Sequence, residues 1–383
     1  MSSGRFASYV EDVRKVVLDF FISAVEFMDH FIPPGTVVQG EVVQNLTERL
    51  KQWNIMDEAL LLAKDYFQLV HDTCVILSRL LSLLEGAASD PRPRLTMDPE
   101  SAKLFLRGLM DEATLRFDEL VNMVWERAVR LSSTMAPISG GVAVRIKDEV
   151  IREIREWVGK ASIVIDAYSR AIKAGGEDEL VEAVLVMLSG LRLLLEGLKR
   201  ISSLFRLEPD PTELPLDKLQ EIISAVSLTL PEVKRGLEAR LNIHQYVVST
   251  LFHMLRVLHG SEKASELLNW LIRESAQSRG WKAAQSLLPE DVNLEELRVG
   301  LVIARTNLED SLRELDHFKR VTEMLSILLN SVDFPLLRNL CEREKEVVSR
   351  VESFIRQALM IVRDASIKVY MAMEELKLLR GSG

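Results

Sequence analysis

The chain has 383 residues, of which 48% are hydrophobic and 27% are charged, and its formal net charge is -9. This length and composition exclude a disordered tail and allow two or three packed domains. The acidic balance disfavours nonspecific binding to nucleic acid or anionic lipid, because such binding requires clustered Lys and Arg.

Apolar residues recur at alternating steps of three and four from the start of the chain, which is the spacing of one helical face. The first such segment extends from Phe6 to Phe31 and ends at Pro33 and Pro34. A shorter amphipathic piece covers about 37–53, and a heptad series then continues from Met56 to Leu84. The sequence therefore predicts helices over these segments.

The region from Gly86 to Thr96 is predicted as a loop, and Asp98 and Pro99 then suit the start of a long helix. This helix is predicted to stop at 137–141, the next has its apolar series over 150–171 and closes at 175–176, and another is predicted over 179–205. The last of these is very apolar, but its longest charge-free run, 183–191, is far below the ~20 residues that a membrane span requires. We therefore expect a bundle helix that is buried on most sides.

A proline-rich, acidic gap follows at 208–215, and beyond it residues 219–258 read as a helix that Pro231 should kink or split. Another helix begins at Ser261 and fades after Trp281. Two long heptad helices, 297–332 and 337–379, end the sequence with a very short connection, which predicts an antiparallel hairpin.

The predicted fold class is all-α, with elongated bundles of long heptad-patterned helices that end in this hairpin. We expect an N-terminal bundle over 1–207, a middle helical region over 208–293 and the C-terminal hairpin over 294–383. Whether the hairpin packs with the middle region as one domain stays open at this level.

Residues with metal-binding or catalytic chemistry are sparse. Glu314 and His317 have the three-residue spacing that di-iron bundles use twice, but it occurs only once here. Glu26 and His30 are a second weak metal candidate. The sequence has no phosphate-binding loop, zinc-type cysteine pair or nucleophile elbow, so we expect no catalytic residues and no cofactor.

The two cysteines, Cys74 and Cys341, stand at apolar helical positions far apart, which favours free thiols in a reducing compartment. The N-terminal residues do not form a signal peptide, so the expected location is the cytoplasm. Abundant Arg and Glu with few Asn and Gln lean towards a thermophilic source.

The favoured function is a non-enzymatic scaffold or adaptor that binds another protein, or a second copy of itself as a homo-oligomer, along a coiled-coil surface. The apolar series of the last helix is longer than a single partner helix needs to cover. The residues of the expected partner surface are Val348, Val351, Ile355, Val362, Val369, Leu376 and Leu379.

Three other interpretations stay open. The chain's own helices could fill this apolar series entirely. The bundle could bind a metal or small ligand between helices, with or without catalysis. The chain could also be a structural protein of a virus or mobile element.

Overall fold

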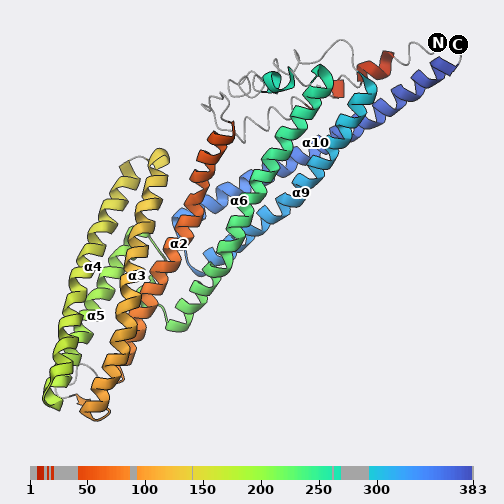
Figure 1. Cartoon of the computed structure of the whole chain (residues 1–383). Coiled ribbons are helices and arrows are strands. Elements are labelled where there is room, and N and C mark those ends of the chain that lie inside the picture. Colours follow the sequence, from red (N-terminus) through yellow and green to blue (C-terminus); the bar gives the residue numbers. More distant parts are fainter. Residues whose placement is uncertain are drawn as a thin grey trace. The chain divides into compact units, whose positions relative to one another are not determined.

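The computed structural model describes residues 7–12, 15–16, 19–20, 42–86, 93–139, 141–260, 263–268 and 293–381. The all-α prediction is confirmed, because helices make up nearly all of the described chain (Figure 1). Of the predicted first helix, only the residues between 7 and 20 given above are described, and these are helical. Glu26 and His30 lie outside the described residues.

The helices follow the predicted segments closely. They are α2 (Val42–Leu81), α3 (Pro99–Ser139), α4 (Gly141–Lys173), α5 (Glu177–Phe205), η1 (Pro211–Glu213, a 3-10 turn), α6 (Leu216–His259), α9 (Leu294–Ser331) and α10 (Pro335–Gly381). Helix α2 is continuous where the sequence suggested two pieces. The predicted loop contains two short antiparallel strands, β1 (Leu84–Glu85) and β2 (Arg94–Leu95).

Side-chain caps fix the starts of two helices. The Asp98 carboxylate accepts a hydrogen bond from the Ser101 backbone N–H at 2.9 Å, as the predicted cap requires. Hydrogen bonds from Ser101 also lower the pKa of Asp98. At the start of α9, the Asn293 side-chain oxygen accepts a hydrogen bond from the Glu295 N–H at 3.1 Å. These caps satisfy backbone donors that the first helical turn leaves without partners.

The chain forms two compact units. Unit 1 comprises Met1–Leu50, Lys234–Thr322 and Glu342–Gly383, and unit 2 comprises Lys51–Val233 and Glu323–Cys341. The boundaries between these units fall inside α2, α6, α9 and α10. The predicted division into domains after residues 207 and 293 stays a prediction. Sequence reasoning placed boundaries in proline-rich loops, whereas a helix can continue from one packed unit into another and keep its backbone hydrogen bonds.

Pro231 does not split α6, which is continuous from Leu216 to His259. A proline inside a helix removes one backbone hydrogen bond and crowds the preceding turn, but packing on neighbouring helices can offset that cost. Of the two outcomes predicted at Pro231, a split does not occur, and a kink stays a prediction.

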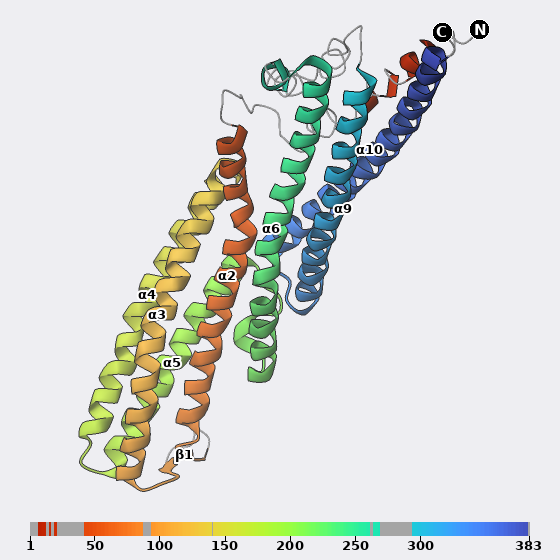
Figure 2. The same cartoon turned by 45° about the vertical axis from the view of Figure 1, so that its right-hand side comes forward.

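In unit 2, helix α4 packs against both α3 and α5, and Figure 2 shows the three side by side. Trp157 of α4 meets Phe117 of α3 edge to face, with ring centroids 5.8 Å apart. Gly190 of α5 allows a close approach, because a Cβ there would lie 2.7 Å from Val164 of α4. These contacts place the core of unit 2 on the inner faces of its helices.

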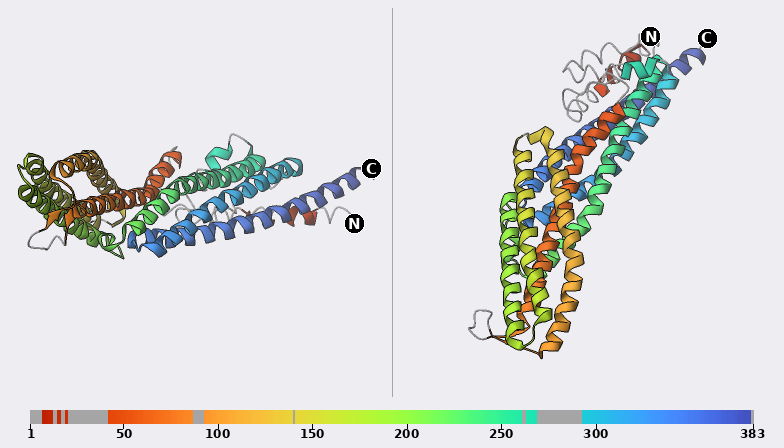
Figure 3. Two further views of the ribbon diagram at one scale, coloured as in Figure 1. Left: turned by 90° about the horizontal axis from the view of Figure 1, so that it is seen from below. Right: turned by 60° about the vertical axis from the view of Figure 1, so that its left-hand side comes forward.

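In unit 1, α9 contacts both α6 and α10, and Figure 3 shows α9 and α10 running alongside each other. The Asn307 side chain of α9 donates a hydrogen bond to the Thr250 hydroxyl of α6 at 3.2 Å. Lys319 of α9 pairs with Glu352 of α10 at 2.8 Å. Heptad pairing along the full predicted hairpin stays a prediction.

Candidate protein-contact surfaces

The partner surface predicted on α10 is mostly buried in the folded chain. Its buried members, none more than 6% exposed, are Val348, Val351, Ile355, Val362 and Val369. Leu376 is half-buried, and the side chain of Leu379 is not described. A partner of the folded chain cannot reach buried side chains, so these five are core residues. This agrees with the alternative interpretation, in which the chain's own helices fill the apolar series.

A different side of α10 is exposed and apolar. Met360, Ile367, Tyr370 and Met371 are 72%, 51%, 62% and 41% exposed. We call these four residues the α10 patch. Ile367 lies seven residues after Met360, and Tyr370 and Met371 lie three and four residues after Ile367, so at about 100° per residue the four residues share one side of the helix. Helix α10 thus has an apolar side towards the core and a second apolar side towards solvent.

Polar side chains border the α10 patch. Arg363 and Asp364 are exposed between Met360 and Ile367, and Asp364 pairs with Lys368 at 3.3 Å. An apolar centre with a charged border is the usual composition of a protein-contact surface, where methionine and tyrosine are also enriched.

The core side of α10 holds one buried ion pair. Glu344, the charged residue within the apolar series, accepts a hydrogen bond from Arg240 of α6 at 2.8 Å, and the two side chains are only 12% and 13% exposed. The Arg240 guanidinium also lies 5.8 Å from the centre of the Phe318 ring of α9. These contacts tie three helices together at one level.

Burial shifts both members of this pair towards their neutral forms. Burial lowers the pKa of Arg240 to about 9, and the Glu344 carboxylate opposes that shift. Burial likewise raises the pKa of Glu344, with Arg240 acting in the opposite direction. Removing either member would therefore take a counter-charge away from the other at a buried position.

Of the metal-ligand candidates, Glu314 and His317 lie in the part of the chain that the structure describes. Glu314 is half-buried and accepts a hydrogen bond from Asn242 at 3.2 Å, whereas His317 is exposed. Within the described part of the chain, no group of three or more His, Cys, Asp or Glu side chains could hold a metal ion.

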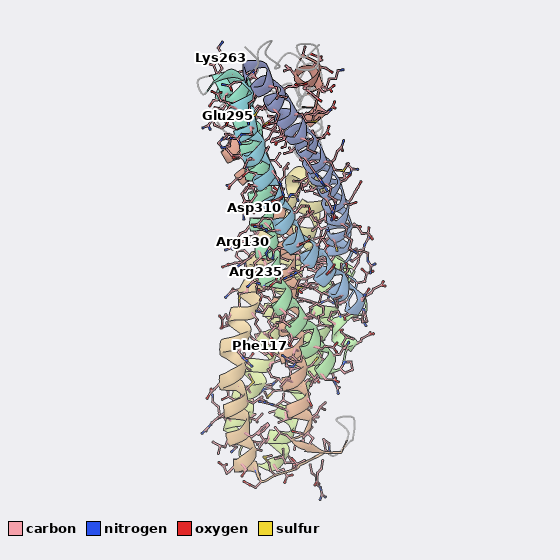
Figure 4. All side chains as sticks on the ribbon, turned by 90° about the vertical axis from the view of Figure 1, so that its right-hand side faces the viewer. Phe117, Arg130, Arg235, Lys263, Glu295 and Asp310 are labelled. Carbon is pink, nitrogen blue, oxygen red and sulfur yellow. The ribbon has the colours of Figure 1, made fainter. Side chains whose placement is uncertain are left out.

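Unit 2 has its own ion network between α2 and α3. Arg127 donates a hydrogen bond to Glu58 at 3.2 Å and lies 3.9 Å from Asp65, and Arg130 (labelled in Figure 4) lies 3.9 Å from Glu58. Burial raises the pKa of Asp65, while Arg127 acts to lower it. The network gives α2 and α3 a polar contact whose charges are paired.

Sequence reasoning missed the α10 patch and the partner of Glu344. The patch had a signal, since Met360 and Ile367 are seven residues apart, but only one apolar series was assigned to this helix. The partner of Glu344 had none, because the register between α6 and α10 cannot be read from either helix alone.

The comparisons with known proteins add no relative: no family model, no curated protein and no solved structure matches this chain. None of the described helices combines the length and hydrophobicity that a membrane crossing needs.

Proposed function

We propose that the chain is a non-enzymatic helical scaffold or adaptor that acts through protein–protein contacts. The observation that carries the proposal is the α10 patch, four large apolar side chains on a helix whose other side is anchored in a core. Contiguous exposed apolar surface on a soluble protein marks an interaction site. A helix already fixed by packing loses little conformational freedom when a partner binds.

The exposed area of the α10 patch limits how much of an interface the patch can form. If each side chain offers about 200 Å² when fully exposed, the exposed fractions amount to roughly 450 Å², against about 800 Å² per partner in a standard interface. The patch would then form the apolar centre of the interface. The remainder would come from the charged border.

The proposal includes a coiled-coil contact with a second copy of the chain. It also includes a reducing, cytoplasmic setting, which is consistent with free Cys74 and Cys341 thiols. A thermophilic source is proposed from the composition alone.

Site-specific photo-crosslinking tests the proposal. A photoreactive phenylalanine derivative replaces Ile367 in the α10 patch, and in a control variant it replaces Arg350, an exposed α10 residue outside the patch. Purified chain is irradiated alone and in an extract of its source cells. We expect a discrete protein adduct from position 367 and not from position 350.

The mass of that adduct separates the two kinds of partner. An adduct of twice the chain's mass in the purified sample identifies a second copy, and another defined mass in the extract identifies a different protein. If position 367 gives no more adduct than position 350 in either sample, the α10 patch is not a contact surface and the proposal is wrong.

A further inference from the structure

Helix α6 passes from unit 2 into unit 1 between Val233 and Lys234, and Pro231 lies just before this point. A proline has no backbone N–H, so the carbonyl of Ser227, four residues earlier, lacks the N–H that a helix normally provides. The proline ring also crowds that carbonyl. The backbone of α6 therefore has one hydrogen bond fewer in the turn that precedes the change of unit.

Side chains in the same stretch of α6 compete with the helix backbone. The hydroxyl groups of Ser224, Ser227 and Thr229 each donate a 2.8 Å hydrogen bond to the carbonyl four residues earlier. Bonds of this kind often accompany bends in helices. They also occur singly elsewhere, for example at Ser366 of α10, but in α6 three of them precede Pro231 within about two helical turns.

The helix is packed on both sides of this stretch. On the unit 2 side, Val226 is only 1% exposed. On the unit 1 side, Gly236 packs so closely that a Cβ there would lie 2.7 Å from Val321 of α9. Pro231, between them, is exposed to solvent. A bend of α6 is therefore expected within residues 227–235, which we call the α6 hinge.

The other helices that pass between the units, α2, α9 and α10, are also continuous. In α9, the last residue before the change of unit is Thr322, whose hydroxyl donates a hydrogen bond to the Lys319 carbonyl at 2.8 Å. Continuous helices allow a limited bend and prevent the free rotation that a flexible linker would permit. Any motion at this level is therefore a bend of small angle.

We propose that the α6 hinge bends in the folded chain, so that the direction of unit 1 relative to unit 2 varies. Hinges in proteins are short stretches that absorb a change in backbone angles while the packed parts on either side move as bodies. This inference goes beyond the proposed function and does not depend on the α10 patch. In an adaptor, such a hinge would let one chain fit partners of different shape.

Distances between the units test the inference. A ketone-bearing amino acid replaces Glu196 of α5 in unit 2 and Gln245 of α6 in unit 1, which are both exposed, and each ketone receives a nitroxide spin label. Ketone chemistry leaves the free thiols of Cys74 and Cys341 unmodified. Pulsed electron paramagnetic resonance of the full chain then gives the distribution of distances between the labels, and its width reports bending.

The variant Pro231→Ala restores the missing N–H at an exposed position and should narrow this distribution by about one third or more. Ser227→Ala removes one competing hydroxyl and should narrow it less. The matched control, Ser366→Ala, removes the same kind of bond from α10 and should leave the width unchanged. A label pair within unit 2, at Glu196 and Glu221, should keep its width in every variant.

Amide hydrogen exchange locates the bend along α6. In the parent chain, we expect residues 227–235 to exchange at least about tenfold faster than residues 243–255 of the same helix, and Pro231→Ala should remove most of this difference. Equal widths between units in the parent and the Pro231→Ala chain overturn the inference. Equal exchange in the two stretches of the parent chain, or equal narrowing by the control, overturns it as well.

Discussion

Replacing Glu344 by leucine should destabilise unit 1 by about 3–5 kcal/mol, because the Arg240 guanidinium would stay buried without its carboxylate. The two groups are 2.8 Å apart with side chains only 12% and 13% exposed, so water can only partly take the place of the lost oxygen atoms. The Phe318 ring would still contact the guanidinium, but a ring face compensates a buried cation less well than a carboxylate does.

The double variant Arg240→Met with Glu344→Leu should recover most of this loss. Apolar residues of similar volume can replace a buried ion pair at little cost, and in some proteins with a gain of about 1–4 kcal/mol. The double-mutant cycle should therefore give a coupling energy of at least about 2 kcal/mol between these positions.

The two single variants should differ in how their free energy of unfolding depends on pH. In Arg240→Met, Glu344 stays buried without its cation, so its pKa lies further above the usual value of 4.5. A carboxyl group with a higher pKa in the folded state binds a proton on folding, so the free energy of unfolding should rise as the pH falls from 7 towards 4.5. Glu344→Leu has no carboxyl group at this position and should lack that rise.

Urea denaturation followed by far-UV circular dichroism measures these free energies, and amide hydrogen exchange of α6 and α10 peptides assigns the change to unit 1. The reasoning is refuted if both single variants cost less than about 1 kcal/mol. It is equally refuted if the double variant is as unstable as the sum of the singles.

Further predictions concern close contacts and buried groups. Gly236→Ala would place a Cβ 2.7 Å from Val321 and should cost about 1–3 kcal/mol, measured as a lower urea midpoint. Gly108→Ala, where a Cβ meets nothing within 4 Å, should instead add about 0.5–1 kcal/mol, and a loss there would contradict the contact argument. Tyr66→Phe removes the 2.6 Å hydrogen bond from its hydroxyl to a buried α5 carbonyl and should cost about 1–3 kcal/mol by the same assay, whereas an unchanged midpoint would show that water replaces it. The buried Cys341 thiol should react with Ellman's reagent only in urea, and rapid labelling of native protein would show that unit 2 opens locally.

The sequence predicted which segments are helical but not which of their sides are covered. Helix bounds follow from local signals, such as the cap at Asp98 and the break at Gly175, and these were read correctly. Whether another helix covers an apolar series depends on contacts between residues distant in sequence. The periodicity of a single helix carries no information about those contacts. On α10, Val362 and Ile367 each belong to an apolar series with helical spacing. Val362 is 1% exposed, whereas Ile367 is 51% exposed.

The division of the chain also depends on such distant contacts. Proline and glycine mark turns, and the prediction assumed that the richest turn region would separate domains. The two compact units meet inside helices, at Leu50, Val233, Thr322 and Cys341. Pro231 lies two residues before Val233, yet α6 continues through it. Because the helices are continuous at these points, helix-ending signals do not locate them.

The order in which the segments are synthesised affects how unit 1 can fold. Unit 1 is assembled from three separate segments, and the last of them, Glu342–Gly383, is synthesised after the other two. Until that segment emerges, the partner helices of α10 expose the apolar surfaces that it later covers, and Arg240 lacks Glu344. Unit 1 can therefore complete its core only after this last segment has emerged, and until then its earlier segments expose apolar surface that can aggregate.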